Sequence, residues 1–230
     1  MGKSKREYGN RWIAYLDILG FKKLVDQHKG NIDTFAEAIY DNVLVEITKR
    51  SDRISNSLNK KVDYAWFSDS FILFTEDDTS DSFSSIETVL WEVFEKMMTT
   101  KKMLRGALSV GEFYSNKERN TYIGPALIDA YDYAEKQKCI GLVLTPKAHD
   151  KLYELGYPIN PTRFSQYQVP IKPEVVKKEK LFTRNIDHLK RYVIEKQKSA
   201  KRDEDYEEKT KVIYENTLKF IEHLESQNQA

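Results

Sequence analysis

The chain has 230 residues, 40% of them hydrophobic, which is enough for one sizeable core, or for one core and a small appendage. Its 37 basic residues nearly cancel its 36 acidic residues and are spread along the chain, which argues against a nucleic-acid partner. The only cysteine, Cys139, excludes a disulfide framework and a cysteine-based zinc site. The N-terminus resembles no signal peptide, and no run approaches the roughly 18 apolar residues of a membrane span, so we expect a soluble cytoplasmic protein.

A strand and a tight turn open the predicted fold. Trp12 to Asp17 form an apolar run rich in aromatic and branched side chains, which predicts a strand. Gly20 lies in the turn that follows, and helix-like spacing comes directly after it. From Ile32 to Arg53 apolar residues recur every three or four positions, which predicts one long helix.

A hairpin and a second long helix come next. The β-rich runs Lys61 to Phe67 and Ser70 to Thr75 are so close that they predict a hairpin with Asp69 at its bend. Apolar positions from Phe83 to Met97 then form the clearest helical stripe, with Ser80 to Ser82 as candidate N-caps. The hairpin therefore stands between two long helices.

The following region alternates strands and short helices. Strands are predicted at Leu104 to Tyr114, Thr121 to Ile123 and Ile140 to Thr145. Gly124 with Pro125, and later Pro146, each begin a helix. Because the strands are not each followed by a crossover helix, this order indicates an α+β sandwich and not a doubly wound sheet.

The composition changes beyond Pro158, where prolines leave room for only one or two edge strands. Two charged helical segments follow, from about Asn185 to Ala200 and from Glu204 to Gln227. We therefore expect a catalytic-size domain over 1–157 and a C-terminal extension over 158–230. In the last helix, Ile213, Phe220, Ile221 and Leu224 share one face, which suits either packing on the parent domain or a dimer contact.

Two aspartates stand at strand ends beside turns, where an acid can face a ligand. Asp17 precedes a glycine turn whose N–H groups, at Leu19, Gly20 and Phe21, can face an anion. Asp69 lies on the hairpin, which can run beside the first strand. Either acid alone suits a turn or cap, whereas the pair with the glycine turn favours a metal ion beside a phosphate.

The segments LDILGFKKL, FSDSFIL, LRGALSVGEF and YIGPALIDAYDYAE, in this order, resemble the motif series of class III adenylyl and guanylyl cyclases. The resemblance covers Trp12 to Thr145 and implies an antiparallel, palm-related sheet with helices packed on it. It implies that Asp17, the carbonyl of Ile18 and Asp69 bind two divalent ions, Mn²⁺ or Mg²⁺, while the turn holds the triphosphate. Ser68 replaces the glycine that usually precedes the second aspartate.

The chain departs from the family at the base pocket and on the later helix. Ala65 and Thr121 stand where purine-reading Lys and Asp are expected. The transition-state Asn and Arg of the family fall near Ile128 or Asp129 and near Asp132, which are not equivalents. Arg105 is the residue that can supply the missing positive charge, although a structural ion pair is an alternative for it.

The altered base pocket and the compact length are similar to the pyrimidine cyclases of Pycsar antiphage defence. That resemblance implies conversion of UTP, or next CTP, to a 3′,5′-cyclic monophosphate that a separate effector reads. It also implies a head-to-tail homodimer with its sites at the interface. The alternatives are an adenylyl or guanylyl cyclase, a degenerate nucleotide-binding domain, a GGDEF-like or polymerase-palm enzyme, and a helical scaffold.

Overall fold

The structure, a computed structural model, describes residues 7–39, 60–171, 180–201 and 208–228, together with Val45 and Lys49. Of the long helix predicted for Ile32 to Arg53, the structure describes Ile32–Ile39 and the two helical positions Val45 and Lys49. The other residues of that prediction lie outside the described residues. The strands are β1 Glu7–Ile18, β2 Val62–Phe67, β3 Ser70–Thr75, β4 Leu104–Asn116, β5 Thr121–Ile123, β6 Gly141–Leu144, β7 Phe164–Tyr167 and β8 Leu181–Arg184. The helices are α1 Phe21–Gln27, α2 Ile32–Ile39, α4 Ser80–Thr99, α5 Pro125–Lys136, α6 Pro146–Glu154, α7 Lys190–Ala200 and α8 Glu208–Gln227, with a 3₁₀ helix at Asp187–Leu189.

One mixed sheet organises the chain in the order β2-β3-β1-β4-β6-β8-β7, with β5 paired to β4 outside this path. Among the strands that the structure describes, only β4 and β6 run parallel, and the other pairs are antiparallel. The predicted α+β class is therefore confirmed, and the sheet excludes a helical scaffold. The first strand begins at Glu7, earlier than the predicted Trp12, because its polar start is held by the register with β4.

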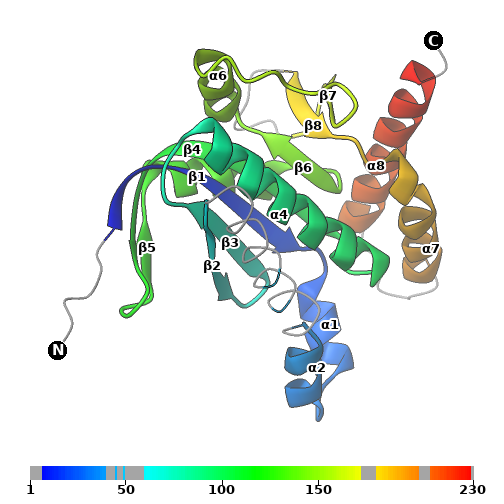
Figure 1. Ribbon diagram of the computed structural model, residues 1–230. Helices are drawn as coiled ribbons and strands as arrows, with labels where there is room; N and C mark the ends of the chain where they lie inside the picture. The colour runs from blue at the N-terminus through cyan, green and yellow to red at the C-terminus, as the bar shows by residue number, and fades with distance from the viewer. Residues whose placement is uncertain are drawn as a thin grey trace.

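The larger core lies between the sheet and α4, which crosses the front of the sheet in Figure 1. The predicted stripe of α4 is buried there, and Ile86, Val93 and Phe94 share this core with Trp12 and Leu16 of β1. The helix is capped by Thr79 and not by Ser80 to Ser82, because the Thr79 side chain accepts from the Ser82 N–H at 3.4 Å. None of the described helices is long and apolar enough to cross a membrane.

The opposite face of the sheet carries α5. Its buried residues Ala126, Ala130 and Ala134 are small, so the helix can lie close against the strands. Gly124 at the N-cap makes this approach possible, since a Cβ there would lie 2.3 Å from the Glu112 carbonyl oxygen. The start of α5 is thereby fixed against β4.

The last part of the chain extends the same sheet and covers its α4 side. β8 pairs with β6, β7 forms an edge strand as predicted, and α7 and α8 stand at one side of Figure 1. Phe220, Ile221 and Leu224 of α8 are buried in the larger core, so this face packs on its own chain and is not a dimer contact. The division at residue 157 stays a prediction.

Candidate functional site

Asp17 and Asp69 lie side by side where β1 ends. Asp17 is opposite Ser70 of β3 on one side and Arg105 of β4 on the other. Asp69 occupies the two-residue turn between β2 and β3, and its carbonyl accepts from the Ile18 N–H at 3.0 Å. The hairpin that the sequence predicts thus runs beside the first strand and brings the two acids together.

The Ile18 carbonyl belongs to the same group. In an antiparallel strand the N–H and C=O of one residue point to the same neighbour, so this oxygen faces the turn that carries Asp69. No cluster of three His, Cys, Asp or Glu side chains suited to a metal is found among the described residues. The strand end offers two carboxylates and a carbonyl oxygen, which are hard ligands suited to Mg²⁺ or Mn²⁺.

Arg105 ties Asp17 to the C-terminal end of α5. Its Nε donates to Asp17 Oδ2 at 2.8 Å, and its Nη2 pairs with Glu135 Oε1 at 2.8 Å. Its Nη1 donates to the main-chain carbonyls of Glu135, at 2.8 Å, and Gln137, at 3.4 Å. A guanidinium suits the carbonyl end of a helix dipole, so Arg105 both pairs with Asp17 and closes α5.

Burial sets the protonation of the side chains around Asp17. The residue is only 6% exposed, and burial raises the pKa of its carboxyl while the Arg105 guanidinium acts in the opposite direction. The charge of Asp69 lies close enough to raise the Asp17 pKa further. Burial also raises the pKa of Tyr15 to about 12, so its hydroxyl, 2.6 Å from Ser70 Oγ, stays protonated.

The glycine turn after β1 is partly satisfied within the chain. Gly20 adopts a left-handed backbone with φ 75°, a conformation that favours glycine. The Leu19 N–H donates to the Met103 carbonyl at 2.9 Å and so does not face a ligand. The N–H groups of Gly20 and Phe21 have no acceptor among the described residues and can face an anion.

Ala65 and Thr121 lie in different parts of the sheet. Ala65 is opposite Ile72 on the hairpin, on the sheet face that carries α5 and Asp17. Thr121 pairs with Asn116, whereas Asp17 pairs with Arg105, eleven residues away along β4 and roughly 35 Å at about 3.3 Å per residue. One chain alone therefore does not bring Thr121 to Asp17.

Two aspartates of α5 take part in ion pairs and hydrogen bonds of their own. Asp129 accepts from Ser109 Oγ at 2.6 Å and lies 3.5 Å from Lys147 Nζ. Asp132 pairs with Lys136 at 3.1 Å, one turn along the helix. The resemblance places Asn near Ile128 or Asp129 and Arg near Asp132, and both of these aspartates are bound within the chain.

Sequence reasoning missed Glu135 and Gln137 as partners of Arg105. Both lie at the end of α5, and the contact depends on how the helix crosses the sheet. One feature of the sequence could have indicated this contact. Glu135 lies in the last helical turn, where the helix dipole disfavours an acid unless a basic residue pairs with it.

The hairpin bend predicts a stability effect at Ser68. This residue has φ 58°, a strained value for a serine, at the position where the resemblance expects glycine. Ser68→Gly should raise the free energy of unfolding by about 0.5–1 kcal/mol, measured by urea denaturation. Ser70→Gly, in the extended strand, is the control and should be destabilising. A loss of stability in Ser68→Gly would contradict the assignment of strain.

Neither a family model nor a curated protein sequence matches the chain. Solved structures do match. The adenylyl cyclase CyaB from P. aeruginosa aligns with a TM-score of 0.51 and 12% identity, over 78% of this chain and 95% of that chain. A second match is the catalytic core of a rhodopsin-guanylyl cyclase with converted specificity, in complex with ATPαS. It aligns with a TM-score of 0.52 and 13% identity, over 78% of this chain and 96% of that chain.

An atypical dimer of the guanylyl cyclase domain of the RhoGC fusion protein from the aquatic fungus Blastocladiella emersonii is also similar. It aligns with a TM-score of 0.50 and 12% identity, over 78% of this chain and 97% of that chain. Each match spans almost the whole of the other domain, in agreement with the sheet and helix order described above. The chain therefore has the fold of the catalytic domains of adenylyl and guanylyl cyclases.

Proposed function

We propose that the chain is a nucleotidyl cyclase that converts a nucleoside triphosphate to its 3′,5′-cyclic monophosphate and pyrophosphate. The observation that carries the proposal is the end of β1, where Asp17, the Ile18 carbonyl and Asp69 meet. These are the positions at which the sequence resemblance expects the metal ligands. The cyclase fold supports the same activity without fixing the base.

Different residues around Asp17 would bind the metal ions, bind the triphosphate and offset negative charge. Two Mg²⁺ or Mn²⁺ ions, held by Asp17, Ile18 and Asp69, would lower the pKa of the ribose 3′ hydroxyl and hold the phosphates. The turn at Leu19, Gly20 and Phe21 would bind the triphosphate, through the N–H groups of its last two residues. Arg105 would offset negative charge at the site and keep Asp17 in place.

A homodimer would complete this site. In the chain alone, Thr121 stands far from Asp17, so a base pocket that uses Thr121 needs a second copy. The α5 side of the molecule exposes Ile123, Ile128 and Tyr131, which are large apolar side chains suited to a protein contact. The similar RhoGC domain was solved as a dimer.

Ile128→Glu tests the contact, since Ile128 is 62% exposed on α5 and a carboxylate there would be buried by a partner. We expect the dimer dissociation constant to rise on the order of 100-fold, with loss of turnover, by light scattering and cyclase assay. Tyr153→Glu, on α6 and 84% exposed, is the matched control and should stay dimeric. A dimer of unchanged affinity in Ile128→Glu would contradict an α5 interface.

For the substrate, we propose UTP first and CTP next. Ala65 offers no polar side chain to a purine, and the resemblance to Pycsar pyrimidine cyclases implies a cyclic pyrimidine nucleotide that signals to a separate effector in antiphage defence. The complex of a similar domain with ATPαS favours a purine instead. An assay that supplies all four triphosphates together at equal concentration with Mn²⁺ distinguishes a pyrimidine preference from a purine preference. The most abundant cyclic product reports the preferred base.

A catalytically degenerate nucleotide-binding domain is the second candidate. It is favoured because the resemblance places the transition-state Asn near Ile128 or Asp129 and the Arg near Asp132, and none of these residues is an equivalent. Both aspartates are already bound within the chain. Calorimetry with each triphosphate and Mn²⁺ distinguishes it, since binding without any cyclic product or pyrophosphate would replace the cyclase proposal.

A further inference from the structure

A pocket on the α4 side of the sheet is lined by residues that the proposed reaction does not use. It has a volume of about 330 Å³ and lies between α4, at Phe83 and Glu87, and the segment from Tyr157 to Phe164. Small-molecule sites commonly range from about 300 to 1,000 Å³. Asp17 lies on the opposite face of the sheet, with α5, so this pocket is separate from the proposed catalytic site.

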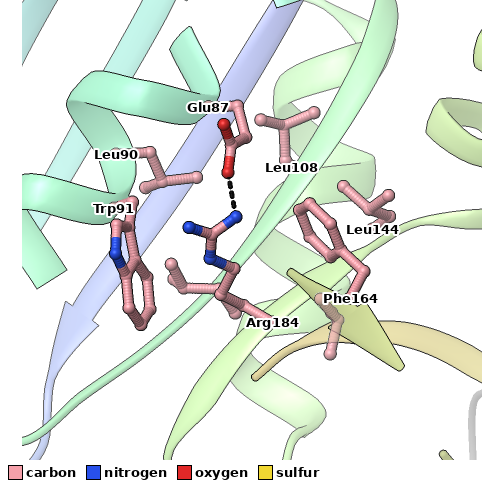
Figure 2. A pocket seen from close by; sticks show the side chains of 9 residues that line it. Glu87, Leu90, Trp91, Leu108, Leu144, Phe164 and Arg184 are labelled. Carbon is pink, nitrogen blue, oxygen red and sulfur yellow. Dashed lines mark hydrogen bonds and ion pairs between the residues drawn. The ribbon is translucent and has the colours of Figure 1, made fainter. Parts of the chain in front are cut away.

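One of the lining residues is Glu87, a buried carboxylate that lies between two arginines. Figure 2, a close view of the smaller neighbouring pocket, shows Glu87 of α4 facing Arg184 of β8. The two form an ion pair with side chains only 6% and 10% exposed. The other oxygen of Glu87 accepts from Arg163 Nη1 at 3.0 Å. Arg184 also stacks on Trp91, 4.3 Å from the ring centroid. Glu87 is therefore fully paired, and Arg184 is enclosed.

Arg163 is the charged lining residue that keeps hydrogen-bond donors available to a ligand. Its side chain is 51% exposed, and Glu87 is its only side-chain acceptor among the described residues. Because Glu87 is shared with the enclosed Arg184, it occupies only one nitrogen of the Arg163 guanidinium and leaves the other donors of that group available. Glu95, further along α4, also acts electrostatically on Arg184, so the exposed Arg163 is the group that can hold an anion.

The remaining walls are largely apolar and aromatic. Phe83 and Tyr157 are in edge contact, with ring centroids 5.0 Å apart. The other lining residues besides Glu87 and Arg163 are Pro158, Ile159, Asn160 and Phe164. Such walls suit a flat apolar body, and a half-exposed guanidinium suits a carboxylate or a phosphate. We propose that this pocket binds a small organic anion, an aromatic carboxylate or phosphate monoester, with Arg163 holding the anionic group.

Phenyl phosphate and benzoate are suitable probes, and they separate phosphate from carboxylate recognition. Saturation-transfer NMR titrations of the full chain should give saturable binding of at least one of them, with a dissociation constant on the order of 1 mM for molecules this small. Benzyl alcohol, which has the ring without the charge, should bind at least about tenfold more weakly. Equal binding of benzyl alcohol would overturn the assignment of Arg163 to the anionic group.

Arg163→Gln tests the residue directly and leaves the buried Glu87 and Arg184 pair intact. It should weaken binding of the anionic probe at least about tenfold. Arg119→Gln, an exposed arginine in the turn between β4 and β5, removes the same charge and should bind as the unmodified chain does. Asp17→Ala should also bind the probe unchanged, which separates this pocket from a substrate site. No saturable binding of either probe, or equal binding in Arg163→Gln, would overturn the proposal.

Discussion

Asp17→Asn and Asp69→Asn are each expected to lower cyclase turnover on the order of 10³-fold, because each removes a charged metal ligand. The fold should survive in both. Burial already raises the pKa of Asp17, so the folded chain disfavours the charge there, and an asparagine oxygen can still accept from Arg105. Turnover is measured with Mn²⁺ and the preferred triphosphate, and folding by circular dichroism and thermal melting.

The matched control is Asp150→Asn on α6. Asp150 is an exposed acid that touches only His149 in the described structure, so its loss should leave turnover within about twofold. Apparent affinity for Mn²⁺ gives a second reading, since residual activity in Asp69→Asn should need more metal. Full activity in Asp17→Asn and Asp69→Asn would remove the proposed metal site even if the chain proved to be a cyclase.

Arg105→Ala should be the most destabilising single change at the site. It leaves the buried Asp17 carboxylate without its cationic partner and frees two carbonyls at the end of α5. Breaking a largely buried ion pair of this kind should cost about 2–4 kcal/mol in the free energy of unfolding, measured by urea denaturation. Arg105→Lys should recover only part of this, because one ammonium cannot reproduce the forked contacts.

Lys136→Ala is the control for Arg105, since Lys136 lies at the same end of α5 and pairs with Asp132 near the surface. It should cost less than about 0.5 kcal/mol. If Arg105→Ala were no more destabilising than Lys136→Ala, the contacts of Arg105 with Asp17 and α5 would not contribute to the free energy of unfolding. Turnover in Arg105→Lys then shows whether charge alone or the forked geometry is needed.

Local patterns in the sequence predicted well that Asp17 lies at the end of a strand and that Asp69 lies at the bend of a hairpin. The apolar run before Asp17 and the two-residue gap before Ser70 are short-range patterns, and they fix the strand end and the hairpin bend. Proximity of the two acids followed from placing the hairpin beside the first strand. The register confirms that placement, with Asp17 opposite Ser70.

Contacts set by packing could not be predicted in this way. The Leu19 N–H donates to the carbonyl of Met103, which precedes β4. Arg105 pairs with Glu135 of α5, the helix on the same face of the sheet and 30 residues later in the chain. Neither pairing has a period or a spacing that marks it in the sequence. The buried Glu87 and Arg184 pair is a further case, because it joins α4 to a strand that the sequence places only loosely.

The most direct test of the cyclase proposal is the product balance of the unmodified chain. Purified protein with Mn²⁺ and each triphosphate in turn is analysed by mass spectrometry for cyclic nucleotide and by a coupled assay for pyrophosphate. We predict 3′,5′-cyclic monophosphate and pyrophosphate in equal amounts from at least one triphosphate, with UTP the best. No cyclic product from any of the four would contradict the account.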